Sequence, residues 1–275
     1  MAALLALVAA LLWGLGAFLG GQASRRAALI PVLAVELLVG TIVIIPLAFL
    51  TAHRFAWVDL LIGGAAGFFG LLGVTFLYRG LRGPMAAVAP VAGVVSAALP
   101  LLWGVGFGER LSAWQIYGVI LGLMSIVLIS DTGRALHRIS LGPLVNGVLA
   151  GAGFGAGYIV LDATDPLTAP WPILGARLLP ALAVCAVAFA AHQPPSAVGP
   201  ARLWSVGAGI STVLASVAFL AAINRGLLST SSVLSCLHPA VTVLLARLFL
   251  RERISPSQAT GLTVAVAAIS MITAG

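Results

Sequence analysis

Residues 109–118 read Glu-Arg-Leu-Ser-Ala-Trp-Gln-Ile-Tyr-Gly, and residues 252–261 read Glu-Arg-Ile-Ser-Pro-Ser-Gln-Ala-Thr-Gly. Five positions of the two stretches are identical, and the second stretch begins 143 residues after the first. Each stretch stands just before the last apolar segment of its half of the chain. An internal repeat of this kind indicates two copies of one structural unit, and it constrains the fold more than any local pattern does.

Other matching pairs extend the repeat over nearly the whole chain, at separations of 141 to 146 residues. The corresponding segments and residues are 14–16 and 155–157 (Gly-x-Gly), 79–81 and 225–227 (Arg-Gly-Leu), Pro31 and Pro172, and Glu36 and Arg177. We therefore divide the chain into a first repeat over residues 1–131, an inter-repeat loop over 132–140 and a second repeat over 141–275.

The composition places the chain in a membrane. Hydrophobic residues make up 61% of it and charged residues 8%, and the mean hydropathy is +1.16. A soluble domain carries about a quarter charged residues, so this chain has too few to cover a wetted surface. The net charge of +7 comes from arginines scattered between apolar runs, a distribution that fits membrane topology and excludes a nucleic-acid partner. Both cysteines, Cys185 and Cys236, lie in apolar segments, so no disulfide framework is indicated.

The apolar runs predict ten transmembrane helices. A helix needs roughly 20 apolar residues to cross the hydrocarbon, and the runs lack the alternation of a membrane β-barrel. The predicted spans are 3–23, 28–50, 60–78, 85–107, 113–130, 141–161, 170–191, 203–224, 228–249 and 256–274. The predicted fold class is therefore an all-α membrane protein.

Five helices in each repeat is an odd number, so the second repeat must enter the membrane from the opposite face. The two five-helix repeats are then inverted, related by a pseudo-two-fold axis in the membrane plane. In membranes this architecture is typical of secondary transporters, whose binding site lies near the midplane between the repeats.

The arginines favour one orientation. The loops after the first, third, fifth, seventh and ninth predicted spans lie on one face and carry nine arginines. The opposite face, which carries the termini, has three: Arg54, Arg110 and Arg225. Because cytoplasmic loops are enriched in Lys and Arg, the count predicts external termini.

These motifs resemble the EamA-type exporters, the ten-helix branch of the drug/metabolite transporter superfamily. The resemblance rests on Leu12-Trp13-Gly14, on Tyr78-Arg79-Gly80-Leu81 and on the doubled signature at 108–118 and 252–261, and it spans essentially the whole chain. Within that superfamily the chain is most similar to bacterial aromatic amino-acid exporters. The resemblance implies cytoplasmic termini, against the arginine count. Family members also often carry Arg in the second helix, where this chain has Glu36.

The ninth span contains the strongest signal for a break. His238 lies near its middle and immediately before Pro239. Proline removes one helical hydrogen bond, and His238 either satisfies the freed backbone or faces a cavity, as in the discontinuous helices of transporters. The matching residue of the first repeat is Ser96, with Pro90 and Pro100 nearby, so we expect helices four and nine to be paired, deformed cavity walls.

Aromatic residues at similar depths are candidates for the walls of the same site. Trp13 and Phe154 are repeat mates, each placed one residue before the first Gly of Gly-x-Gly. Aromatic walls would stack on indole or phenyl groups. The further candidate substrate-binding residues are Tyr78, Trp103, Tyr158 and Asn224, the last of which matches Tyr78 in the repeat.

The charges within the spans leave two interpretations open. Glu36 and Arg177 occupy equivalent repeat positions and either bind a zwitterion or a proton, or make structural polar contacts near helix ends. Arg247 lies near a helix end, where snorkelling toward the headgroups is expected. Glu109 and Glu252 are read as caps or salt bridges that fix the loops.

Together these features predict an inner-membrane secondary transporter that exports small amphipathic metabolites, with aromatic amino acids the favoured class, by alternating access. Its partners would be a small-molecule substrate and the lipid bilayer, with a monomer favoured and no metal or other cofactor. Histidine spacing offers no zinc site, and nucleotide-binding motifs are absent from the sequence. The alternatives are an exporter of drugs or other amino acids, and an intramembrane enzyme that uses His238 and Glu36.

Overall fold

The computed structural model describes residues 1–81, 85–129, 141–251 and 254–275. Every regular element in these ranges is helical. The first repeat forms α1 (Ala2–Ser24), α2 (Leu29–Thr51), α3 (Trp57–Leu81), α4 (Met85–Gly106) and α5 (Ala113–Ile129). The second forms α6 (Leu141–Asp162), α7 (Trp171–Ala190), α8 (Arg202–Ile223), α9 (Leu228–Ser235), α10 (His238–Leu250) and α11 (Pro256–Ala274), with short 3-10 helices η3 (Pro166–Thr168) and η4 (Pro195–Ala201). The inter-repeat loop at 132–140 lies outside the described residues.

The helices confirm the prediction of ten spans. Eight candidate spans are long and apolar enough to cross a bilayer, and two shorter apolar helices, Val91–Gly106 and Ala113–Ile129, complete the set within the described residues. The ninth span, Leu228–Leu250, consists of α9 and α10 together.

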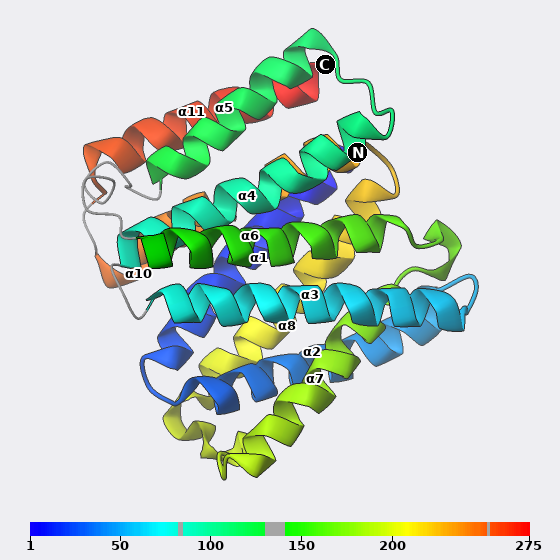
Figure 1. The fold of residues 1–275 in the computed structure, drawn as a ribbon, viewed down its shortest axis with the longest axis vertical. Helices are drawn as coiled ribbons and strands as arrows, with labels where there is room; N and C mark the ends of the chain where they lie inside the picture. The colour runs from blue at the N-terminus through cyan, green and yellow to red at the C-terminus, as the bar shows by residue number, and fades with distance from the viewer. Residues whose placement is uncertain (82–84, 130–140, 252–253) are drawn as a thin grey trace.

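The packing of α5 against α11 shows that the repeats are inverted. At one end of the pair, the Ser257 hydroxyl at the start of α11 donates to the carbonyl of Leu128 near the end of α5, at 2.9 Å. At the other end, Gly275 lies against Ser112, just before α5 begins. The two helices are therefore antiparallel repeat mates, side by side at one end of the molecule (Figure 1).

The repeated signature folds into the same local structure twice. Ser112 Oγ accepts from the backbone N–H of Gln115, whose side chain accepts from the N–H of Ser112. Ser255 and Gln258 make the same reciprocal pair. Each capping box satisfies two N–H groups at the start of a helix that otherwise lack partners. Because α5 and α11 are antiparallel, the two capping boxes lie at opposite faces of the membrane.

The first glycine of each Gly-x-Gly motif also makes equivalent contacts in both halves. A Cβ built on Gly14 in α1 would lie 2.5 Å from Val241 Cβ in α10. One built on Gly155 in α6 would lie 3.0 Å from Leu99 Cβ in α4. Each glycine thus lets the first helix of one repeat approach the fourth span of the other. Such close approach through small residues is the usual basis of helix packing in lipid.

The second glycine of each motif faces the third helix of the other repeat. A Cβ on Gly16 would lie 2.5 Å from Thr212 Cγ2 in α8, and one on Gly157 would lie 3.0 Å from the Ala66 carbonyl oxygen in α3. The crossing contacts α1–α8 and α6–α3 therefore join the two repeats into one body.

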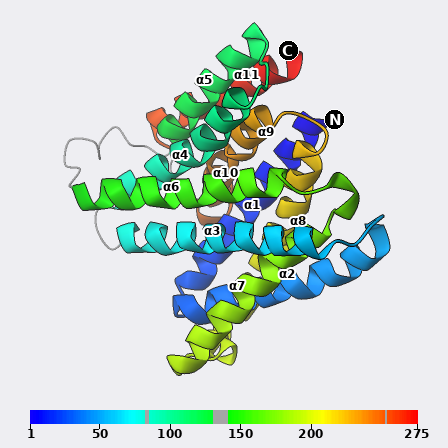
Figure 2. The ribbon, with the colours of Figure 1, turned by 45° about the vertical axis from the view of Figure 1, so that its right-hand side comes forward.

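The remaining helices arrange themselves around these crossings. In both views α2 and α7 lie at the end opposite to α5 and α11, with α1, α3, α6 and α8 between them (Figures 1 and 2). Both chain termini lie on the same side as the α2–α3 and α6–α7 connections. On that side Arg54 and Asp165 pair at 3.6 Å, and the N–H of Arg54 donates to the carbonyl of Leu167 at 3.0 Å.

The close contact at Gly14 leads to a prediction about stability. In Gly14→Ala the new methyl group would meet the His238 carbonyl oxygen at 2.7 Å as well as Val241, so helices α1 and α10 must separate. Forced overpacking of this kind costs about 1–3 kcal/mol. We expect a lower midpoint of thermal unfolding for the purified protein in detergent. The control is Gly21→Ala in the same helix, where nothing lies within 4 Å of the added carbon. Equal midpoints for the two variants would contradict the packing described.

Candidate functional site

The ninth span is interrupted in the middle of the molecule. Helix α9 ends at Ser235 and α10 begins at His238, with Pro239 in its first turn. Helix α4, by contrast, is continuous from Met85 to Gly106 through Pro90 and Pro100, so the prolines of the first repeat do not divide their helix. The break therefore belongs to the second repeat alone. The roles of all three prolines in gating stay predictions.

The N–H groups and side chains around the break find hydrogen-bond partners within the ninth span and on helix α1. The N–H groups of Cys236 and Leu237 donate to Ser232 and Leu234 at 2.9 and 3.2 Å. The Ser235 hydroxyl donates to the Ala6 carbonyl on α1 at 3.2 Å. His238 Nδ1 lies 3.3 Å from the carbonyl oxygen of Ser235. In hydrocarbon such partners are what allow a helix to be broken.

An aromatic cluster lies beside this break, made of Trp13, Tyr158, Phe219 and His238. The Trp13 ring stacks on Tyr158, with centroids 5.6 Å apart, and lies 5.4 Å from Phe219. Tyr158 and Phe219 are 4.7 Å apart, and His238 meets Trp13 edge-on at 6.5 Å. The cluster takes α1 from the first repeat and α6, α8 and α10 from the second.

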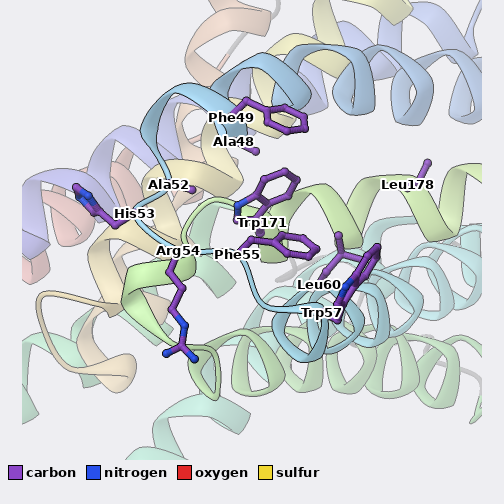
Figure 3. Close-up of a pocket in the computed structure, with 10 residues that line it drawn as sticks. All are labelled: Ala48, Phe49, Ala52, His53, Arg54, Phe55, Trp57, Leu60, Trp171 and Leu178. Carbon is purple, nitrogen blue, oxygen red and sulfur yellow. The ribbon is translucent and has the colours of Figure 1, made fainter.

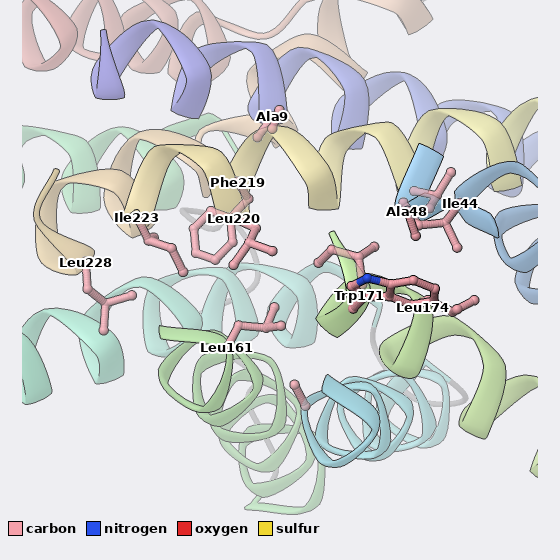
Figure 4. Packing of buried hydrophobic residues seen from close by; sticks show 14 residues of the cluster. Ala9, Ile44, Ala48, Leu161, Trp171, Leu174, Phe219, Leu220, Ile223 and Leu228 are labelled. Atoms are coloured by element: carbon pink, nitrogen blue, oxygen red, sulfur yellow. The ribbon is translucent and has the colours of Figure 1, made fainter. Parts of the chain in front are cut away.

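The aromatic cluster is anchored on one side and partly open on the other. Phe219 is fully buried and belongs to the hydrophobic core cluster drawn in Figure 4. Trp13, Tyr158 and His238 are only half-buried, although Trp13 lies near the middle of α1 and His238 at the break; Tyr158 lies four residues before the end of α6. These three rings therefore keep some accessible surface, unlike Phe219.

Ser96 lies on the flank of the cluster. Its hydroxyl is 3.5 Å from Sγ of Cys236, which lies within the break, and also donates to the Gly93 carbonyl at 2.9 Å. Tyr158 packs against the buried cluster that contains Cys236. The structure thus brings together four of the residues named from the sequence: Trp13, Ser96, Tyr158 and His238.

The other named residues lie elsewhere. Trp103 is 44% exposed and stacks on Phe107 at 4.1 Å, near the end of α4. Asn224 follows α8 as its C-cap. Phe154 lies at the contact of α6 with α3, where a Cβ on Gly73 would meet its ring at 2.8 Å. Tyr78 lies on α3 and Pro90 on α4, but their side chains are outside the described residues.

Sequence reasoning missed Phe219 and Cys236. The repeat mate of Phe219, 146 residues earlier, is Gly73, so a search for matching aromatic pairs passes over it. Cys236 was considered only as a possible disulfide partner. The one available signal was its position two residues before the predicted break.

The ionisable residues Glu36 and Arg177 form a separate polar cluster with α8. Thr212 Oγ1 donates to Glu36 Oε1 at 3.1 Å. Arg177 Nη2 donates to the Thr212 carbonyl oxygen at 2.7 Å and to Ser216 Oγ at 2.8 Å. These contacts join α2, α7 and α8 within the membrane.

Glu109 binds the start of α9, far from its own position in the sequence. Its Oε1 accepts from the N–H of Leu228 at 2.6 Å, and its Oε2 accepts from the N–H of Ser229 at 3.0 Å and from the Ser229 hydroxyl. A carboxylate at a helix N-terminus satisfies free N–H groups and complements the helix dipole. Glu109 is thus a cap, but for a helix of the other repeat. Its second copy, Glu252, lies outside the described residues.

A pocket of about 650 Å³ lies away from all of these groups, between the end of α2 and the starts of α3 and α7 (Figure 3). Its walls include Phe49, Phe55, Trp57 and Trp171, with Arg54 at the rim. Phe49 and Trp57 are about 70% exposed, so the pocket lies at the surface of the molecule. The described residues contain no group of three or more potential metal ligands.

Comparison with known proteins gives a family and a fold. The EamA-like transporter family model matches residues 1–131 and 142–274. A solved structure described as "Crystal structure of protein" superposes with a TM-score of 0.77 at 21% identity, over 99% of this chain and 96% of its own. At that identity the likeness concerns the fold alone. No curated protein matches the chain in sequence.

The long-range cap on α9 leads to a second stability prediction. Glu109→Ala would leave two backbone N–H groups and the Ser229 hydroxyl without the carboxylate. Hydrogen bonds to a charged group contribute about 1.5–3 kcal/mol each at most, and partial replacement by water reduces the loss. We expect a marked fall in the thermal midpoint. Arg110→Ala is the matched control, because that neighbouring side chain is exposed and should change stability by less than about 0.5 kcal/mol. A midpoint for Glu109→Ala no lower than the control would show that the cap contributes nothing.

Proposed function

The chain belongs to the EamA-like transporter family, and on that premise we propose that it exports small amphipathic metabolites, with aromatic amino acids as the substrate class. One observation carries the proposal: Trp13, Tyr158 and Phe219 form an aromatic cluster beside the break in the ninth span. We place the substrate ring against the half-buried faces of Trp13 and Tyr158.

The chemistry of the cluster suits an aromatic ring. Offset and edge-on ring pairs with centroids about 4.5–7 Å apart are favourable beyond the area that they bury. Ligand sites are mostly apolar, with a few placed polar groups that fix orientation. Here the polar groups are Ser96, whose hydroxyl lies 3.5 Å from Cys236 Sγ, and the imidazole of His238, two residues after Cys236.

The inverted repeats supply the mechanism. The aromatic cluster draws on both repeats, so a movement of one repeat against the other changes which face of the membrane the cluster opens to. The backbone break at 235–238 gives the ninth span two short rigid helices, α9 and α10, in place of one long helix. We propose that α10 moves relative to α9 as the site alternates.

The family membership also decides between the alternatives. EamA-like proteins are transporters, so the interpretation of His238 and Glu36 as an intramembrane enzyme is wrong. An exporter of drugs or of other amino acids would use the same architecture. The tight stacking around Trp13 favours a planar aromatic group over an aliphatic one.

The test is flux of radiolabelled tryptophan and phenylalanine into proteoliposomes that contain the purified protein. We expect saturable flux of both amino acids, and little flux of leucine. Trp13→Ala removes the stacking partner, worth about 0.5–1.5 kcal/mol beyond lost area, so flux per folded protein should fall several-fold.

Trp114→Ala is the control, since Trp114 is 57% exposed at the start of α5 and far from the aromatic cluster. Thermal stability is measured on the same preparations, so that loss of folding is not read as loss of transport. Unchanged tryptophan flux in Trp13→Ala would place the substrate elsewhere, and equal leucine and tryptophan flux would reject the aromatic class.

A further inference from the structure

The polar cluster of Glu36, Arg177, Thr212 and Ser216 has unused hydrogen-bonding groups inside the membrane. Within the described residues, both hydrogen bonds donated by the Arg177 guanidinium come from Nη2. A guanidinium has five N–H groups, so those on Nε and Nη1 are available. Glu36 accepts from Thr212 through Oε1, and its Oε2 faces Gly20, where an added Cβ would still be 4.0 Å away. All four side chains are half-buried and keep some accessible surface.

The same faces of two helices connect this polar cluster to the aromatic cluster. On α8, Thr212, Ser216 and Phe219 are spaced at intervals of four and three residues, which places them along one face. Ser216 and Phe219 are separated by only about 4.5 Å along the helix axis, at 1.5 Å per residue. On α1, Trp13 meets Phe219 while Gly16 meets Thr212. The two clusters therefore follow one another along α1 and α8. Because Gly16 and Thr212 are packed directly together, a ligand that touches rings at one end and charges at the other must lie beside this contact and not within it.

The first repeat has no equivalent of this polar cluster at the positions that match Thr212 and Ser216. The mates of Thr212 and Ser216, 146 residues earlier, are Ala66 and Gly70, which offer no side-chain hydrogen bond. Glu36 and Arg177 are themselves mates, yet they carry opposite charges. The polar groups are therefore gathered on the α8 side, where the aromatic cluster also lies.

We propose that Glu36 and Arg177 bind the two charged groups of a zwitterionic substrate, with Arg177 on its carboxylate and Glu36 on its ammonium group. This inference rests on the proposed function, because it uses the aromatic cluster as the site of the substrate ring. Charge-assisted hydrogen bonds are roughly twice as strong as neutral ones, and arginine matches a carboxylate with two parallel N–H groups. Intramembrane charges are costly, and a substrate that bears both charges neutralises both side chains at once. The substrate class is accordingly α-amino acids, and not aromatic amines or aromatic acids.

The test compares three indoles that differ only in charge. Tryptophan carries both groups, tryptamine lacks the carboxylate, and indole-3-propionate lacks the ammonium group. Each unlabelled compound competes with labelled tryptophan for flux into proteoliposomes. For the unmodified protein we expect tryptophan to compete about tenfold or more better than either analogue, as lost hydrogen bonds to charged groups imply.

Two variants then assign each charge to its residue. Glu36→Gln should abolish the preference for tryptophan over indole-3-propionate and keep the preference over tryptamine. Arg177→Gln should do the reverse. Arg202→Gln is the control for loss of a positive charge, since Arg202 is exposed at the start of α8 and should leave both preferences intact.

The outcomes separate this inference from the proposed function. If the unmodified protein transports tryptophan but the analogues compete equally well, the charge-binding inference is overturned and the aromatic site stands. This outcome is measured on the unmodified protein, so it does not depend on whether a variant folds. If both variants lower all flux and leave the preferences unchanged, the polar cluster is a structural cross-link of α2, α7 and α8. If the unmodified protein moves no tryptophan, the proposed function itself fails.

Discussion

The structure depends on how it satisfies backbone polar groups where the ninth span is interrupted. In hydrocarbon an unpaired N–H or C=O costs several kcal/mol, so a broken helix persists only among suitable partners. Here Glu109 caps the start of α9, and Ser235 reaches across to α1 just before the break. Beyond the break, Thr242 Oγ1 donates to the Gly14 carbonyl at 3.1 Å. Both short helices are therefore held by the first repeat, and the aromatic cluster is held with them.

The two repeats pack their helices in the same way, but the candidate ligand-binding groups are not distributed equally between them. The arrangement of the helices is symmetric, because the glycines at 14 and 155 and the capping boxes at 112 and 255 make matching contacts. The groups suited to a ligand gather on one side, around α1 and α8. In the proposed mechanism the symmetric arrangement of helices lets the two repeats move against each other, and the asymmetric site holds the substrate in one orientation.

The sequence predicted the features that both repeats have in common. It predicted only part of the candidate site, where the two repeats differ. The number of spans and their inverted arrangement follow from periodicity, charge and spacing. For Glu109 the sequence indicated a cap or a salt bridge within its own loop, whereas the structure shows a cap on α9 of the other repeat. Capping boxes form between residues three apart, so they too can be read locally. Position within an apolar run, however, fixes neither the exact depth of a side chain nor the face of the helix that it occupies: Trp103 was expected at the site but is 44% exposed near the end of α4. Phe219 was missed because its mate is a glycine.

The central claim is that the break at His238 lies in a cavity that opens to each face of the membrane in turn. The most direct measurement uses His238→Cys, with Cys185 and Cys236 replaced by alanine, in oriented membrane vesicles. A small, membrane-impermeant thiol reagent is added from one face or the other, with and without saturating tryptophan. The account predicts labelling from both faces and slower labelling when tryptophan is present. Labelling from one face only, at a rate that tryptophan does not change, would contradict it.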